Sequence, residues 1–382
     1  MYKKTVSIFS SLVVATITAT IPSLAYGVTY QETSMINTSI YPGYGVKLLA
    51  QNQSVSSNLD QLLRQGRALA DAGKYQQAIA IYQQAARLDP KNAKIYSGIA
   101  YLEALQGNFQ AASQFYQQAI AIEPHKADFQ YGLGYSMAKL ENYQAAVEAY
   151  RRASLLDRNN VNAHLGLGAT LFRLERYNEA IVAYQVAIRS DSNNAEAHAS
   201  MGLALLKQER FPEALQALRE AVRLSPRNAR MQIKLGTALL STGDVNRGLA
   251  ALELASRLNP RNADIQFQIA EIYKVQNNPQ AALKFYQRAA YANPNLVEAK
   301  FAAAEILLET QDYLQAIIMY RQVIKKNPDN ADAHYKMGLA LHRRERDREA
   351  RKSFETALKL FEKQNNFEGQ EKVEAIMKEL EN

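Results

Sequence analysis

Apolar residues recur along most of this chain at the spacing of an amphipathic α-helix, in blocks that repeat every 34 residues. The block at residues 161–194 shows the pattern clearly, as two apolar-periodic segments joined by a short turn at residues 175–178. Four of its residues recur at the same offsets in most neighbouring blocks: Gly168, Ala180, Tyr184 and Ala187. The pattern predicts an all-α chain of tandem helix-turn-helix hairpins.

Nine such units follow one another without an insertion or deletion. They are residues 59–92, 93–126, 127–160, 161–194, 195–228, 229–262, 263–296, 297–330 and 331–364. The eighth position of each unit is Gly or Ala, and the twenty-fourth is large: Tyr82, Tyr116, Tyr150, Tyr184, Leu218, Leu252, Tyr286, Tyr320 and Phe354. Two helices approach to about 8 Å only where their contact positions are small. We therefore expect the large residue to fill the space beside the small one, and each unit to stack on the next.

Residues at the unit boundaries support this division. An asparagine stands one residue before most first helices, where its side chain caps a helix N-terminus: Asn58, Asn92, Asn160, Asn194, Asn228, Asn262 and Asn330. A proline marks the end of most second helices: Pro90, Pro124, Pro226, Pro260, Pro294 and Pro328.

The period of 34 and the small and aromatic positions resemble the tetratricopeptide repeat family over residues 59–364. One departure is the fourth position, where the family often has Trp and this chain has residues such as His164, His198 and His334. The resemblance implies a right-handed superhelical solenoid. It also implies that first-helix positions 2, 5, 9, 12 and 13 line a concave groove that binds extended peptides or partner helices.

Both ends of the chain differ from the repeats. In residues 365–382, Val373, Ile376, Met377 and Leu380 share one helical face, which predicts a terminal helix that caps the last unit. A helix offered to a partner is the alternative for this segment.

The N-terminal segment has the pattern of an export signal. Lys3 and Lys4 precede an uncharged, mostly apolar stretch at residues 5–25, which ends in small residues before Tyr26. This predicts a signal peptide at residues 1–25, cleaved before Tyr26; the alternative is an uncleaved membrane anchor formed by residues 5–25. Either one places the repeats outside the cytoplasm, for example in a periplasm. Residues 26–58 show no sustained period and are predicted to be a poorly structured linker.

Composition adds few constraints. The chain has 382 residues, of which 47% are hydrophobic and 21% charged, an ordinary globular balance. It contains no cysteine, which excludes disulfides, thiolate metal sites and a thiol nucleophile. Its net charge of +8 gives at most a mild bias toward anionic partners.

Motifs that carry chemistry are weak in this sequence. The pairs Gly132/Gly134 and Gly166/Gly168 fall inside predicted helices with no strand before them, so they do not form a nucleotide-binding loop. His164 and His198 lie one repeat apart, too far to share a metal ion. The charge run at residues 343–352 alternates acids with bases and is interpreted as a self-paired surface. We predict no enzymatic activity, no cofactor, no metal site and no nucleic-acid partner.

The positions that the resemblance assigns to the groove carry aromatic and charged residues. Positions 5, 9, 12 and 13 share one helical stripe, so these side chains point together, and exposed aromatics suit hot-spot contacts. The candidate partner-binding residues are Tyr101, Tyr131, Tyr135, Phe172, Arg173, Lys207, Phe267, Glu271, Phe301, Glu305, Tyr335 and Arg343. The alternative is that several of these rings only fill space within the solenoid.

We therefore expect a protein-binding scaffold that holds a peptide or a partner segment in its groove. Two alternatives belong to other classes. One is a regulatory or substrate-presenting arm of a separately encoded enzyme, and the other is a self-assembling structural solenoid. The partner itself is not readable from the sequence.

Overall fold

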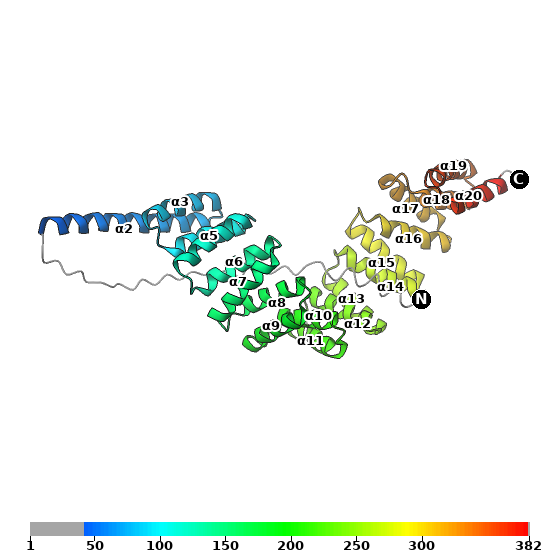
Figure 1. Ribbon diagram of the computed structural model, residues 1–382. Helices are drawn as coiled ribbons and strands as arrows, with labels where there is room; N and C mark the ends of the chain where they lie inside the picture. The colour runs from blue at the N-terminus through cyan, green and yellow to red at the C-terminus, as the bar shows by residue number, and fades with distance from the viewer. Residues whose placement is uncertain (1–41, 381–382) are drawn as a thin grey trace. The chain divides into compact units, whose positions relative to one another are not determined.

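The computed structural model describes residues 42–380 (Figure 1). The predicted signal segment and its cleavage position lie outside the described residues. The chain divides into two compact units, whose described parts are residues 42–224 and residues 225–380. We call them the N-terminal unit and the C-terminal unit and consider each by itself.

Helical hairpins build both units, and the described residues form no strand. The N-terminal unit contains α2 (Pro42–Asp71), α3 (Tyr75–Leu88), α4 (Ala93–Leu105), α5 (Phe109–Ile122), α6 (Ala127–Lys139), α7 (Tyr143–Leu156), α8 (Val161–Arg173), α9 (Tyr177–Ser190), α10 (Ala195–Lys207) and α11 (Phe211–Leu224). The C-terminal unit contains α12 (Ala229–Ser241), α13 (Val245–Leu258), α14 (Ala263–Val275), α15 (Pro279–Ala292), α16 (Val297–Glu309), α17 (Tyr313–Lys326), α18 (Ala331–His342), α19 (Asp347–Lys363) and α20 (Phe367–Glu379). Even-numbered helices up to α18 are the first helices of the hairpins. The predicted all-α fold of tandem hairpins is confirmed.

The first helix differs from the prediction at its start. Helix α2 begins at Pro42, inside the segment predicted to be a linker, so Asn58 lies within the helix and does not cap it. Residues 46–58 contain neither Gly nor Pro and include Leu48, Leu49 and Ala50, which are strong helix formers. Local propensity therefore extends this helix beyond the repeat period.

The large residue at position 24 is held between small residues of two hairpins. A β-carbon on Gly134 of α6 would lie 2.9 Å from Tyr150 Cδ1, and one on Gly166 of α8 would lie 2.5 Å from Tyr150 Cε1. The Tyr150 side chain is 2% exposed. One tyrosine of α7 thus packs against its own first helix and the next one, which couples consecutive hairpins.

The turn inside each hairpin has a residue in the left-handed region at position 15. Glycine fills this position at Gly73, Gly107 and Gly243, but Glu175 also adopts it, with φ of 58°. The conformation turns the chain so that Arg176 N–H donates to the carbonyl of Leu171 at 2.9 Å. A non-glycine residue adopts this conformation at a cost of about 1–2 kcal/mol, which the packing of the two helices offsets.

The predicted asparagine caps form at several first helices, though not at all of them. The Oδ1 atom of Asn160 accepts from Ala163 N–H at 2.9 Å, and Asn330 caps α18 in the same way. Asn92 makes no such bond; its Nδ2 donates to Asp89 Oδ2 at 3.1 Å. Asn194 donates to Asp191 in the same way and also caps its helix, so the bond to the acid does not by itself prevent capping.

Position 4, where the chain departs from the family pattern, has a structural role. His164 Nε2 lies 3.1 Å from the carbonyl oxygen of Arg158, six residues earlier, and His334 Nε2 lies 3.0 Å from that of Pro328. Lys300 Nζ makes the same bond at 2.8 Å to Pro294. Because a carbonyl only accepts, these histidines donate through Nε2–H and tie the inter-hairpin turn to the helix that follows it.

The C-terminal helix α20 caps the last hairpin, as its apolar spacing predicts. Val373 is fully buried, and Ile376, Met377 and Leu380 pack around it. The approach of α20 is close, because a β-carbon on Gly369 would lie 2.5 Å from Phe361 Cδ1.

We predict that Gly168→Leu will destabilise the N-terminal unit. A β-carbon at this position would lie 2.5 Å from Tyr184 Cε1 in a fully packed site, so the added side chain forces the α8–α9 hairpin apart. The expected loss is about 1–3 kcal/mol, measured from the urea midpoint by circular dichroism. Ala169→Leu, which changes the next residue of the same helix, is the control and should leave the midpoint nearly unchanged. An unchanged midpoint for Gly168→Leu would contradict the packing.

Candidate functional site

The sequence-predicted residues of the N-terminal unit lie on first helices, and most of their rings contact another ring. We call the surface formed by positions 2, 5, 9, 12 and 13 of the first helices the first-helix face. Tyr131 lies 5.8 Å from Tyr150, measured between ring centroids. Phe172 makes an edge contact with Tyr177 at 5.3 Å. These rings are half-buried, so they fill space and also present a surface.

Tyr135 is held from two sides. Its ring lies 6.0 Å from that of Phe109, and Lys139 Nζ lies 5.4 Å from its centroid. Tyr101 of α4 is also half-buried, and it packs against the core cluster that includes Ile99.

The charged candidates mark the ends of first helices. Arg173 and Lys207 are the last residues of α8 and α10 and are exposed. Arg343 is also exposed, but it is the C-cap of α18, which is one residue shorter than first helices such as α4 and α16. Nearby, in the charge run, Arg346 Nη2 pairs with Glu349 Oε1 at 2.5 Å. The run is therefore partly self-paired.

Aromatic pairs repeat along the first-helix face of the C-terminal unit. In three consecutive hairpins the ring at position 5 contacts the ring at position 24 of the same hairpin. The pairs are Phe267 with Tyr286 at 5.6 Å, Phe301 with Tyr320 at 5.9 Å, and Tyr335 with Phe354 at 6.0 Å. The position-24 rings are fully buried, whereas the position-5 rings are half-buried and reach the surface.

The two candidate acids of this unit have different partners. Glu271 accepts a hydrogen bond from the Tyr286 hydroxyl. Glu305, one repeat later, pairs with Lys336 of α18, and Lys274 Nζ lies 3.8 Å from its other oxygen. Lys336 Nζ also lies 5.2 Å from the centroid of Phe301.

Two buried tyrosine hydroxyls of the described residues, those of Tyr184 and Tyr320, have no hydrogen-bond partner. The Tyr320 hydroxyl makes no hydrogen bond within residues 42–380, although Tyr286 at the same repeat position does. Burial, followed by the charges of Glu305 and Glu309, raises the pKa of Tyr320. The lysines thus draw Glu305 away from the tyrosine that would otherwise donate to it.

Sequence reasoning missed Lys274 and Lys336 as parts of this surface. Lys336 stands at position 6, which the groove pattern does not include. A sequence signal could have found it. One unit has an aromatic residue at position 5 and a glutamate at position 9, and the next unit has a lysine at position 6.

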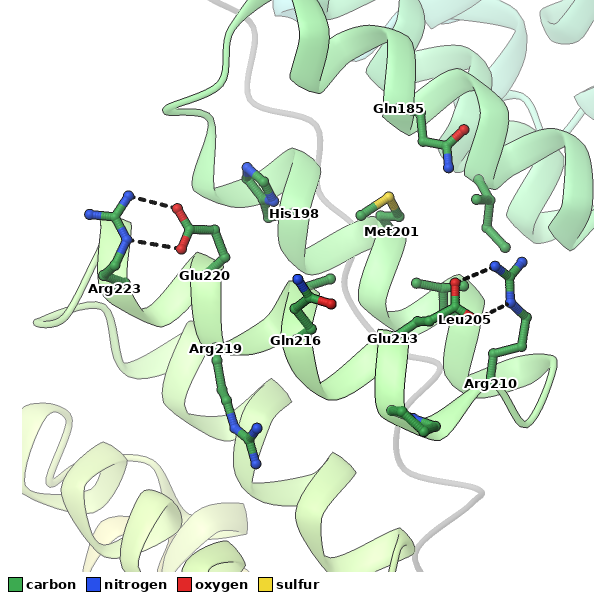
Figure 2. A pocket seen from close by; sticks show the side chains of 13 residues that line it. Gln185, His198, Met201, Leu205, Arg210, Glu213, Gln216, Arg219, Glu220 and Arg223 are labelled. Atoms are coloured by element: carbon green, nitrogen blue, oxygen red, sulfur yellow. Dashed lines mark hydrogen bonds and ion pairs between the residues drawn. The ribbon is translucent and has the colours of Figure 1, made fainter.

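A hollow of about 930 Å³ lies in the N-terminal unit between α9, α10 and α11 (Figure 2). Ile181, Met201 and Leu205 give it an apolar lining, while Gln185 and Gln216 add amide groups. None of the sequence-predicted residues lines this hollow.

Two ion pairs flank the hollow, as the dashed lines of Figure 2 show. Arg210 Nε donates to Glu213 Oε1 at 2.9 Å, and Arg223 Nη2 donates to Glu220 Oε1 at 2.6 Å. Each arginine hydrogen bond lowers the pKa of its carboxyl group. A general acid needs a raised pKa, so this arrangement suits binding rather than proton transfer.

Other chemical sites are not evident in the described part of the chain. No group of three or more His, Asp or Glu side chains is placed to hold a metal ion within residues 42–380. No helix in this range combines the length and apolarity that crossing a bilayer requires.

The geometry defines a protein of stacked helical hairpins, and comparison with known families identifies which class this is. A family model described as the Cilia and flagella-associated protein 70 C-terminal domain matches residues 38–264, more than half of the chain. Tetratricopeptide repeat models match residues 233–296, 304–344 and 331–364. The chain belongs to this family of tetratricopeptide repeat proteins.

Several solved structures are similar to parts of the chain. A tetratricopeptide repeat protein from Parabacteroides merdae is 14% identical, with 66% of this chain and 99% of that chain covered and a TM-score of 0.52. Pseudomonas aeruginosa pilF is 19% identical over 57% of this chain and 99% of its own, with a TM-score of 0.48. YrrB, described as having an unusual peptide-binding site, is 23% identical over 48% of this chain and 95% of its own, with a TM-score of 0.40. No curated protein sequence matches the chain.

We predict a pH-dependent loss of stability that involves Tyr131. Burial, followed by the charge of Tyr135, raises the pKa of Tyr131 to about 12, above the ordinary value near 10 of an unfolded chain. The buried neutral phenol therefore stabilises the fold fully below pH 10, and this contribution is lost as the pH rises toward 12. Tyr131→Phe should reduce this alkaline loss in urea titrations between pH 9 and 12. An identical pH profile for the variant would contradict the assignment.

Proposed function

We propose that this protein is a non-enzymatic scaffold that holds an extended segment of a partner protein on its first-helix face. The observation that carries the proposal is that some repeat positions serve stacking while others vary on the surface. Positions 8 and 24 stay small and large from hairpin to hairpin, because every hairpin needs them to stack. The first-helix face instead changes from hairpin to hairpin and presents half-buried rings and charges.

The chemistry of this face suits a peptide. Half-buried aromatic rings supply contact area at a low entropy cost, and such side chains dominate the binding energy of protein interfaces. Tyr131 and Tyr135 lie on one helix with Phe172 on the next first helix, so an extended segment that crosses α6 and α8 meets all three.

The proposal is tested by replacing Tyr131, Tyr135 and Phe172 together with alanine. Partners are first captured by in-cell crosslinking, and their affinities for the purified variant are then measured by titration calorimetry. We expect binding to weaken at least tenfold, as is typical when hot-spot side chains are truncated. The ring contacts described above are each worth about 1 kcal/mol, so the variant must be compared at a temperature where both proteins are fully folded.

A matched control alters exposed apolar residues away from the first-helix face. Leu155 of α7 and Val182 of α9 are 72% and 57% exposed. Replacing both with alanine should leave partner affinity unchanged. Loss of binding in this control, with none in the triple variant, would move the site to the second-helix side.

We also propose that the scaffold acts outside the cytoplasm, in a periplasm or an equivalent compartment. The support is the N-terminal order of two lysines, an uncharged apolar stretch and small residues before Tyr26. An uncleaved anchor at residues 5–25 would place the repeats in the same compartment.

Mass spectrometry of the protein isolated from its native host distinguishes the two forms. Cleavage by a signal peptidase predicts a chain that begins at Tyr26 in the soluble extracytoplasmic fraction. A chain that keeps Met1 in the membrane fraction would support the anchor. A chain that keeps Met1 in the cytoplasm would contradict export.

A further inference from the structure

Two consecutive hairpins of the C-terminal unit carry the same pair of groups on their first helices. Phe267 and Glu271 on α14 are four residues apart, as are Phe301 and Glu305 on α16, so in both cases the ring and the carboxylate share one helical face. In each pair the ring rests on a buried tyrosine at position 24. We call the first pair the α14 box and the second the α16 box.

The α16 box holds a cation that the chain itself supplies. Lys336 reaches over from α18, with its Nζ 5.2 Å from the Phe301 centroid and paired with Glu305. This combines a cation over a ring face with an ion pair. The box is partly screened from water, since the side chains of Lys336 and Glu305 are 29% and 24% exposed.

The α14 box has the same groups but no cation. The residue 34 positions before Lys336 is Ala302, and the residue 34 positions before Lys274 is Leu240. Glu271 accepts the hydroxyl of Tyr286 and makes no ion pair with any residue of the described range 42–380. Its ring partner Phe267 is half-buried and packs on the core that contains Ala302 and Tyr286.

We propose that the α14 box binds a lysine or arginine side chain of the partner segment, in the place that Lys336 takes in the α16 box. This rests on the proposed function, because the box lies on the first-helix face, and it specifies the chemistry of the partner. The occupant is a cation because the box offers a ring face and a carboxylate, and because the repeat one step later shows which group such a box holds.

The residue at position 6 of the following first helix explains why the α16 box is filled by a lysine and the α14 box is not. A lysine at position 6 of the following first helix reaches the α16 box, whereas Ala302 at the same position before the α14 box has only a methyl group and carries no charge. The partner side chain therefore meets one open cation site on this part of the face. The position of the partner segment along the first-helix face is then fixed by the basic side chain that occupies this site.

The test uses the full-length chain and an array of nonapeptides with Gly, Ser and Tyr flanks. The central residue is arginine, lysine, citrulline or norleucine, so that charge changes while length is kept. We expect the arginine and lysine peptides to bind more tightly than the citrulline and norleucine peptides. Glu271→Gln keeps an acceptor for Tyr286 but removes the charge, and should abolish this preference with a loss of about three- to tenfold.

Two substitutions at Ala302 supply a matched comparison. Ala302→Lys places the lysine of the α16 box in the α14 box and should block the basic peptides by about the same factor. Ala302→Met adds a side chain of similar reach without the charge and should keep the preference. Lys336→Ala removes the lysine from the α16 box and should raise retention of the arginine and lysine peptides.

The outcomes separate this inference from the proposed function. If peptides bind through other residues of the first-helix face but Glu271→Gln and Ala302→Lys change nothing, the α14 box is not a cation site and the scaffold proposal stands. If the array retains no peptide, or if no first-helix variant alters retention, both proposals fail. Circular dichroism of each variant ensures that the loss is not unfolding, and Glu271→Gln alone decides if Ala302→Lys does not fold.

Discussion

The contact between a position-24 side chain and the glycines beside it determines how the hairpins of this protein assemble. Tyr150 is the clearest case, because Gly134 and Gly166 from two different first helices lie against its ring with no space for a β-carbon. An interior glycine weakens its own helix by about 0.5–1 kcal/mol, and the close approach of the helices offsets this cost. The same ring joins one hairpin to the next. The hairpins therefore stack with a repeat that follows the recurrence of these glycines in the sequence. Where position 24 is leucine, as at Leu218, a glycine still faces it.

This constraint leaves only part of each first helix free to vary. Positions 4, 8 and 24 are occupied by hydrogen bonding and stacking, as His164, Gly168 and Tyr184 show in one hairpin. The remaining exposed positions carry the differences between hairpins. The N-terminal unit presents Arg173 and Lys207 there, and the C-terminal unit presents Glu271 and Glu305. Any partner specificity must therefore come from these differences, because a regular stack has no other source of it.

The C-terminal unit also shows how a repeat protein modifies one copy of a surface without changing its fold. Glu271 and Glu305 have the same repeat position and the same neighbouring ring. Two positions differ around these carboxylates: Lys336 and Lys274 lie beside Glu305, whereas Ala302 and Leu240 stand at the corresponding positions for Glu271, which accepts a tyrosine hydroxyl instead. The buried Tyr320 hydroxyl without a hydrogen-bond partner is the cost of that exchange. The two hairpins thus differ in the groups beside one carboxylate, while their stacking positions stay the same.

The sequence by itself determined the helical hairpins, their period and the residues that stack, because these depend on local propensity and on contacts between neighbouring units that repeat identically. Tyr131, Phe267 and Glu271 became groove candidates through the resemblance to the tetratricopeptide repeat family, which assigns their repeat positions to the groove. The sequence pattern placed the start of the first helix wrongly, since residues 42–58 follow no repeat period and yet belong to α2. Only the tertiary structure showed that Lys336 reaches Glu305, and that three helices enclose a hollow beside Met201. Those features arise where side chains from different hairpins meet, and such meetings depend on side-chain reach and direction, which a one-dimensional pattern does not contain.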